Sequence, residues 1–327
     1  MSEMVKKERV IGVDVGGTKV AAGLVDRDGV IGLNIRVAMS AKGTAEEGLA
    51  AVQQGIDLLL RESGKSAKDL KGIGICAPGP LDPKTGIVVN PPNLTCWRNF
   101  PLGAEISQRY GVPVKVDNDA NAAALAEALW GAGRGYKTVF YACIGTGIGT
   151  GIVFDGRIYH GRTGAAAEGG HVSIDYRGPV CGCGKRGCIE ILAAGPAIAR
   201  RARAKLSEQP SRTSAMRELS HGNIDAVSSE MVGQANAAGD ALAREVLRET
   251  VELLALWLGN VVDFLEPDVM IIGGGVAAML RPFFAEFPER LAAHCVNSRS
   301  REVPLLVTHY GADSGIAGGA ALCSAIS

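Results

Sequence analysis

The chain has 327 residues, of which 47% are hydrophobic and 21% are charged, proportions typical of a globular protein with a sizeable core. Its 34 basic and 34 acidic residues balance, so bulk charge gives no argument for a nucleic-acid or membrane partner. The N-terminal segment lacks the apolar stretch of a secretory signal, and no apolar run is long enough to cross a bilayer, so we expect a cytoplasmic protein.

The first part of the chain predicts a meander of three strands, followed by alternating helices and strands. The expected strands are Val10–Val15, Lys19–Val25, Val30–Val37, Ile73–Ala77 and Val112–Val116. Apolar residues recur at helical spacing from Thr44 to about Ser63. A second, alanine-rich helix is expected after Asp117–Asn121 and ends near Gly131. This order of elements predicts one α/β lobe.

The second part repeats this theme around an irregular, cysteine-containing segment from Gly161 to Gly187. The expected strands are Thr138–Ile144, Ile152–Phe154, Arg157–Tyr159, Val269–Ile272 and Leu305–Thr308. The expected helices are Ile189–Leu206, Asp240–Leu265 and Ser314–Ile326. The polar segment from Ser207 to Ser229 is expected to be a surface excursion.

Neither of the two common phosphate-binding motifs is present. Gly64-Lys65-Ser66 matches the tail of a Walker A loop, but Leu59 stands where its first glycine is required. A dinucleotide fingerprint fails at Gly145–Gly149, because Thr150 or Ile152 stands where its third glycine is required.

Two glycine-containing turns remain as candidate phosphate sites. The first is Asp14-Val15-Gly16-Gly17-Thr18-Lys19, whose backbone N–H groups, Thr18 hydroxyl and Lys19 can face phosphate oxygens. Asp14 can hold a hydrated magnesium ion. The turn Gly145-Thr146-Gly147 stands at the matching place in the second lobe, so the two could grip a triphosphate between the lobes. The alternative is a pair of ordinary tight turns.

Three cysteines and a histidine predict a metal site. His171, Cys181, Cys183 and Cys188 supply one nitrogen and three sulfur donors, a set that suits a closed, tetrahedral and therefore structural zinc ion. The other five cysteines are scattered and are expected to be small core residues. The alternatives are a chance cluster, or a redox pair formed by Cys181 and Cys183.

The segment Asp117-Asn118-Asp119 closes a predicted strand and offers a carboxylate for catalysis. A carboxylate at this place can accept a proton from a sugar hydroxyl as that hydroxyl attacks a phosphate. The alternative role for Asp119 is to cap the helix that begins at Ala120.

The chain resembles the ROK family (repressors, open reading frames and kinases), a branch of the actin-like ATPases. The resemblance rests on four motifs in order: the DxGGT turn at Asp14, the NDAN segment at Asn118, the GTGIG turn at Gly145 and the CxCGxxGCxE segment at Cys181. It runs from about Val10 to the C-terminal helix.

The resemblance implies an α/β fold of two ribonuclease-H-like lobes with a cleft between them and a zinc loop, residues 171–190, in the second lobe. The implied small lobe comprises residues 1–119 joined by the C-terminal helix, about 312–327, and the large lobe comprises residues 120–311. A homodimer is implied by the resemblance alone.

The resemblance also implies roles for individual residues. Asp119 becomes the general base, and Gly274 and Gly275 contact the adenosine part of ATP. The residues implied to contact the sugar are Gly79, Asn93, Asn118, Asp119, Glu168, His171 and Glu190. Zinc binding through one imidazole nitrogen leaves the other nitrogen of His171 free for a sugar hydroxyl.

Two residues depart from the family pattern. Gly169 stands between Glu168 and Gly170, where a bulky apolar residue is usual, and its backbone freedom is expected to loosen the sugar pocket. Thr150 stands where glycine is usual after the phosphate turn, and is expected to have little effect.

The function implied is ATP-dependent phosphorylation of a hexose, foremost glucose, at its 6-hydroxyl. The alternative substrates are N-acetylmannosamine, N-acetylglucosamine, mannose, allose and fructose. A sugar-responsive repressor is the rival of a different class, and it is disfavoured because only nine residues precede Val10, too few for a DNA-binding module.

Overall fold

The structure, a computed structural model, describes residues 9–324, and their contacts divide into two compact units. The first unit holds residues 9–141, 151–167 and 308–324, and the second holds residues 142–150 and 168–307. These units have other limits than the two predicted lobes, whose boundaries lie after residue 119 and near residue 312. The predicted lobes stay a prediction. Across residues 9–324, no helix combines the length and apolar character needed to span a membrane.

The first unit is built on a five-stranded sheet of order β3-β2-β1-β4-β7. Its strands are β1 (Arg9–Val15), β2 (Lys19–Val25), β3 (Ile31–Ala38), β4 (Leu70–Ala77) and β7 (Val114–Asn118). The first three pair antiparallel, which confirms the predicted meander, and β4 and β7 continue the sheet in parallel. The short strands β5 (Leu81–Asp82) and β6 (Ile87–Val88) form a separate ribbon.

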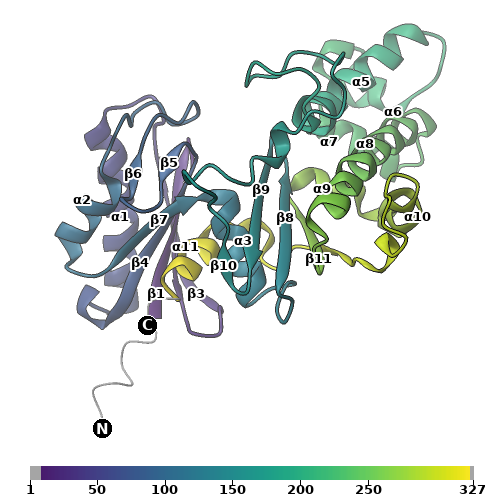
Figure 1. The fold of residues 1–327 in the computed structure, drawn as a ribbon. Helices are drawn as coiled ribbons and strands as arrows, with labels where there is room; N and C mark the ends of the chain where they lie inside the picture. The colour runs from purple at the N-terminus through teal and green to yellow at the C-terminus, as the bar shows by residue number, and fades with distance from the viewer. Residues whose placement is uncertain (1–8, 325–327) are drawn as a thin grey trace. The chain divides into compact units, whose positions relative to one another are not determined.

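Helices cover both faces of this sheet. Helices α1 (Ala45–Ser63) and α2 (Leu102–Tyr110) pack on one face, and α3 (Asp119–Leu129) and α11 (Ser314–Ser324) lie side by side on the other (Figure 1). Strand alternation divides the core, since Ile11 and Val13 face α1 whereas Val10 faces α11. Gly74 lets α11 approach the sheet, because a Cβ there would lie 1.7 Å from the Gly319 oxygen.

The ends of α1 are fixed by its own sequence. Thr44 and Glu47 form a capping box at the first turn, and Gly64 ends the helix in the left-handed conformation, with φ 63°. The predicted helix is therefore confirmed at both ends. The predicted C-terminal helix is confirmed as far as Ser324, and its last residues lie outside the described residues.

A second five-stranded sheet has the order β10-β9-β8-β11-β12. Its strands are β8 (Thr138–Ile144), β9 (Ile148–Phe154), β10 (Arg157–Ile158), β11 (Val269–Gly273) and β12 (Leu305–Val307). Strand β9 begins four residues before its predicted start, so the turn between β8 and β9 comprises only residues 145–147.

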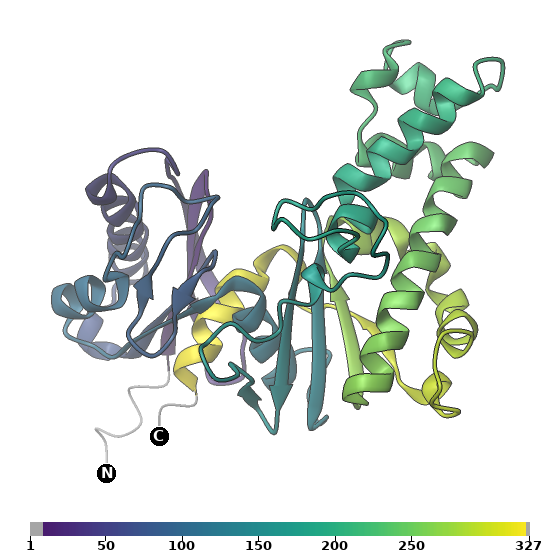
Figure 2. The ribbon, with the colours of Figure 1, turned by 45° about the horizontal axis from the view of Figure 1, so that its top comes forward.

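The second unit is largely helical (Figure 2). Its helices are α4 (Ile189–Ala193), α5 (Gly195–Glu208), α6 (Ala215–Leu219), α7 (Ser229–Ala237), α8 (Ala241–Leu265), α9 (Gly275–Leu280) and α10 (Phe287–Ala292). The long helix α8 contacts α4, α5, α7 and α10 and carries much of the core.

One prediction about these helices was wrong. The single helix expected over Ile189–Leu206 is broken at Ala194, which is extended with ψ 168°. The break follows from Pro196, which has no N–H to continue the hydrogen-bond ladder of α4 and is accommodated in the first turn of α5. The excursion expected over Ser207–Ser229 contains α6, which Ser214 caps by accepting a hydrogen bond from the Met216 N–H.

Candidate functional site

The first unit presents Asp119 at the junction of β7 and α3. The N-cap of α3 is Asn118, whose Oδ1 accepts hydrogen bonds from the N–H groups of Ala120 and Asn121, at 2.9 and 3.3 Å. Asp119 is the first residue of the helix, and its Oδ1 also accepts from Ala120 N–H, at 2.8 Å. Since Asn118 supplies the cap, capping is not the reason for a carboxylate at position 119.

Asp119 is an exposed residue, but the surrounding protein shifts the pKa of its carboxyl group from the usual value. Desolvation by the surrounding protein, together with the negative charge of Asp14, raises the pKa of Asp119 to about 6. Solvent access moderates this rise without reversing its direction. A carboxylate with a raised pKa is a better proton acceptor near neutral pH than an ordinary aspartate.

A pair that the sequence analysis missed, the buried Asp117 and the half-buried His160, lies next to this segment. Asp117, 4% exposed, accepts a hydrogen bond from the backbone N–H of Asn118, at 2.7 Å, and pairs with His160 Nε2, at 2.6 Å. The hydrogen bond to Asp117 raises the pKa of His160. The two residues are 43 positions apart, so no local pattern indicated the pair.

The turn between β1 and β2 lies near one of the predicted sugar-binding positions, Asn93. It is closed by a hydrogen bond from Gly16 N–H to Lys19 O, at 3.0 Å, and Thr18 and Lys19 are exposed. A Cβ on Gly17 would lie 3.3 Å from the Asn93 oxygen, so these two segments touch.

Gly79 similarly approaches the segment Asp117–Asp119. A Cβ on Gly79 would lie 3.4 Å from Asn118 Nδ2. The loop that carries Gly79 and the N-terminus of α3 therefore lie against each other, as expected if both face one sugar.

Asp14 lies at the end of β1 in a half-buried position. Its pKa is raised by desolvation, an effect that Cys76 Sγ, 3.6 Å from Asp14 Oδ1, and the positive charge of Lys19 oppose. The start of α11 packs directly on this carboxylate, since a Cβ on Gly315 would lie 2.3 Å from Asp14 Cγ. A divalent cation bound here would favour the ionised form.

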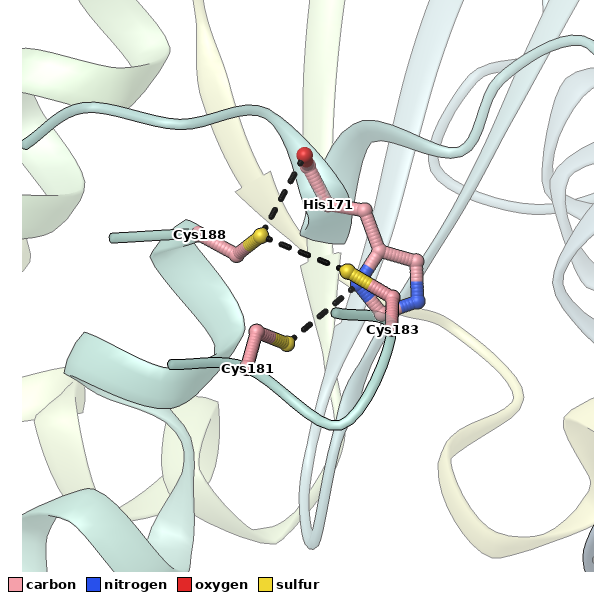
Figure 3. Close-up of side chains that lie close together, drawn as sticks. All are labelled: His171, Cys181, Cys183 and Cys188. Atoms are coloured by element: carbon pink, nitrogen blue, oxygen red, sulfur yellow. Dashed lines mark hydrogen bonds between the residues drawn. The ribbon is translucent and has the colours of Figure 1, made fainter. Parts of the chain in front are cut away.

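The second unit brings the four predicted metal ligands together (Figure 3). One donor atom from each of His171, Cys181, Cys183 and Cys188 lies within 4.8 Å of the other three. The Sγ atoms of Cys183 and Cys188 are 3.7 Å apart, and Cys181 Sγ lies 3.7 Å from His171 Nδ1. These separations match the edges of a tetrahedron with zinc–sulfur bonds of about 2.3 Å, which are close to 3.8 Å. The four residues could therefore hold a zinc ion through Nδ1 of the imidazole.

Glu190 connects this cluster to the turn between β8 and β9. It follows Cys188 in α4, and its Oε1 lies 3.9 Å from both Cys181 Sγ and His171 Nδ1. Its Oε2 accepts a hydrogen bond from Ile148 N–H, at 2.9 Å, and would lie 2.6 Å from a Cβ on Gly147. One carboxylate thus contacts both the metal loop and the turn Gly145-Thr146-Gly147.

Two other glycines support the same turn. The N–H of Gly195, at the start of α5, donates to Gly145 O at 2.8 Å. Gly274, with φ 90°, packs so closely that a Cβ would lie 2.3 Å from the Ile144 oxygen. The structure therefore groups the turn with Gly274, which the sequence analysis named, and with Gly195, which it missed. Glu168 precedes the cluster as an exposed residue just before the short 3₁₀ turn Gly169–His171.

The predicted site residues thus form one group in each unit. The first unit holds Asp14, Gly16, Gly17, Thr18, Lys19, Gly79, Asn93, Asn118 and Asp119. The second holds Gly145, Thr146, Gly147, Glu168, His171, Cys181, Cys183, Cys188, Glu190, Gly274 and Gly275.

Comparisons with known proteins agree with these features. The model of the ROK family matches residues 10–326. A glucokinase from Thermotoga maritima is 33% identical over 316 residues, which are 97% of each chain. A xylose repressor from Caldicellulosiruptor bescii is 30% identical over 292 residues, covering 89% of this chain and 70% of the repressor.

The fold is also shared with a solved structure. The crystal structure of a ROK family glucokinase from Streptomyces griseus, in complex with glucose and AMPPNP, matches with a TM-score of 0.81 and 33% identity. The match covers 96% of this chain and 98% of the glucokinase. The predicted α/β fold class is therefore confirmed.

Proposed function

This chain belongs to the ROK family, and on that premise we propose that it is an ATP-dependent hexose kinase that phosphorylates the 6-hydroxyl of its substrate, with glucose preferred. The observation that carries the proposal is Asp119, an exposed carboxylate with a raised pKa whose capping role is taken by Asn118. The similarity to two glucokinases supports the choice of glucose.

In the proposed reaction Asp119 accepts the proton of the 6-hydroxyl as that oxygen attacks the γ-phosphate. The other sugar hydroxyls are held by Gly79, Asn93, Asn118, Glu168, His171 and Glu190. The backbone N–H groups of Gly16–Thr18 and of Gly145–Gly147, with Lys19, bind phosphate oxygens. Gly274 and Gly275 contact the adenosine part of ATP.

The proposed reaction involves two metal ions, one bound with ATP and one structural. Asp14 would hold the magnesium ion that accompanies ATP and offsets the charge of the phosphates. His171, Cys181, Cys183 and Cys188 would hold a structural zinc ion, which fixes the irregular segment that carries them and leaves Nε2 of His171 for the sugar. A homodimer, implied by family resemblance alone, stays a prediction.

A substrate panel with coupled detection of ADP tests the proposal. Glucose, mannose, fructose, allose, N-acetylglucosamine and N-acetylmannosamine are compared at saturating magnesium and ATP, and we expect the highest kcat/KM with glucose. The Asp119→Asn variant should lose roughly 10²- to 10⁴-fold in kcat, the usual contribution of a general base. Asp225→Asn changes an exposed aspartate of the second unit and should leave turnover unaltered.

The same panel addresses a second candidate that the similarity to a xylose repressor favours, a sugar-binding regulator without phosphotransferase activity. Such a protein would show a sugar-dependent rise in Tm and no sugar-dependent ADP formation. That result would reject the kinase. An Asp119→Asn variant with near-normal turnover would instead reject Asp119 as the general base.

A further inference from the structure

The two departures from the family pattern, Thr150 and Gly169, are in direct contact in the structure. Thr150 lies in β9 with 5% of its surface exposed, and its Oγ1 accepts a hydrogen bond from Gly169 N–H, at 2.8 Å. Gly169 begins the 3₁₀ turn Gly169–His171, which joins Glu168 to the metal ligand His171. A residue expected to have little effect therefore contacts the segment that carries two proposed sugar-binding side chains.

Thr150 also explains why position 169 is a glycine. A Cβ on Gly169 would lie 2.7 Å from Thr150 Oγ1 and 3.2 Å from its Cγ2. Threonine branches at Cβ and is stiff about χ1, so it cannot readily turn aside. Gly169 is not in the left-handed region, so its own backbone conformation does not require glycine. The requirement comes from Thr150.

The turn that contains Gly169 is held from several directions. The fully buried Trp257 donates from Nε1 to Gly169 O at 3.1 Å, while Thr150 accepts from its N–H. Gly170 lies against β9, where a Cβ would come within 2.0 Å of the Ile148 oxygen. Gly169 therefore lies in a fixed peptide unit, contrary to the expectation that it loosens the pocket.

We propose that Thr150 is a positioning residue for sugar binding, and that Thr150 and Gly169 act as one coupled pair. The Thr150 hydroxyl fixes the Gly169 peptide, and through it the directions of Glu168 and His171 on either side. This inference rests on the proposed sugar kinase activity for its functional consequence, but the coupling itself is a property of the fold.

The central variant is Thr150→Val, which preserves the branched shape and removes the hydrogen-bond acceptor. Losing the acceptor of an ordered N–H should raise the KM for the sugar roughly fivefold, the change expected for one lost hydrogen bond. The KM for ATP should stay unaltered, and kcat should change less than the sugar KM. Thr150→Ser keeps the hydroxyl and should restore the wild-type KM.

Thr250→Val is the matched control. Thr250 is a fully buried threonine of α8 in the same unit, and its hydroxyl donates to Val246 O at 3.0 Å and accepts from Arg201 Nη2 at 2.5 Å. Its replacement should lower Tm by an amount similar to Thr150→Val while the sugar KM stays at the wild-type value. A sugar KM that rises equally in both variants would show a general loss of stability and would overturn the positioning role.

The coupling is tested by a double-mutant cycle in Tm. Gly169→Ala alone should lower Tm because its methyl group meets Thr150. The same substitution in a Thr150→Gly background should lower Tm much less, because the obstructing side chain is gone. If Gly169→Ala lowers Tm equally in the two backgrounds, Thr150 and Gly169 are not coupled.

Hydrogen exchange separates this proposal from the proposed function, because it needs no substrate. The backbone amides of residues 168–172 should exchange faster in Thr150→Val than in wild type or Thr250→Val. If exchange is faster but the protein has no sugar kinase activity, Thr150 fixes the turn Gly169–His171 and the proposed reaction is wrong. Unchanged exchange in Thr150→Val would show that Thr150 does not fix this turn, even if the protein is an active kinase.

Discussion

At the scale of single residues, Asp119 has the properties of a proton acceptor that works near neutral pH. Its carboxyl group reaches solvent, while desolvation and the charge of Asp14 raise its pKa to about 6. Both effects disfavour the ionised form, so the ionised carboxylate binds a proton more strongly than an ordinary aspartate does. An exposed position is also what a group that must touch a substrate requires.

This property predicts the acid side of the pH profile. Because the raised pKa makes Asp119 protonated, and so inactive as a base, below about pH 6, kcat/KM should fall tenfold per pH unit under that value. In the substrate-free protein, the carboxyl carbon resonance lost in Asp119→Asn should titrate with a midpoint near pH 6. If every aspartate carboxyl titrates below pH 5, the raised pKa is wrong.

The sequence located this residue but could not describe its surroundings. Asp117, Asn118 and Asp119 stand together at a predicted strand end, so their place in the fold could be predicted. The sequence does not tell which of them caps α3, because the side-chain oxygens of Asn118 and Asp119 can both accept a hydrogen bond from Ala120 N–H. The partner of Asp117, His160, lies on a distant segment, and only the folded chain brings the two together.

At the scale of elements, the segment from 171 to 190 has little regular structure of its own. Between the 3₁₀ turn and α4 it is organised by two isolated bridges, Ser173 with Cys188 and Val180 with Arg186. Ligand identity and spacing were enough to predict the metal cluster, because four soft or borderline donors in one segment have few other uses. The contact of Glu190 with Ile148 N–H was not predictable, since it joins residues 42 positions apart.

If the cluster holds zinc, metal loss should therefore disturb the proposed phosphate turn as well as the proposed sugar site. Cys183 is the exposed cysteine of the cluster, so Cys183→Ser would remove a proposed metal donor without leaving a core cavity. We expect zinc content below one ion per chain, a lower Tm, and higher KM values for both sugar and ATP, because Glu190 contacts both segments. The ATP effect distinguishes this variant from Thr150→Val.

The control for this variant is Cys295→Ser, which changes a half-buried cysteine of the same unit outside the cluster. Zinc content and both KM values should then match those of the wild type. Full zinc occupancy in Cys183→Ser, or a wild-type Tm in the presence of a strong chelator, would contradict a structural zinc ion.

At the scale of the whole molecule, a buried carboxylate marks the place where the chain returns to the first unit at residue 308. Glu127 of α3 is fully buried, and its Oε1 accepts hydrogen bonds from the N–H groups of His309, at 2.8 Å, and Tyr310, at 3.1 Å, and from the Thr308 hydroxyl. Its Oε2 accepts from Ala132 N–H at 2.9 Å. Four donors thus converge on one acid and fix the segment that leads into α11.

Replacing this acid by its amide should cost more than an ordinary surface change. Both oxygens of Glu127 accept from N–H donors, so the amide nitrogen of Glu127→Gln must face a donor in either orientation. We expect the free energy of unfolding of the first unit to fall by about 2 kcal/mol, the usual cost of hydrogen bonds lost to a buried charged group. Glu62→Gln, an exposed glutamate of α1, should change it by less than about 0.5 kcal/mol. Denaturant unfolding of both variants measures the difference.

Hydrogen exchange measures the same loss locally, since α11 covers one face of the first sheet. Relative to wild type, Glu127→Gln should speed amide exchange more in α11 than in α1. An equal change in the two helices would show that Glu127 does not anchor the returning chain.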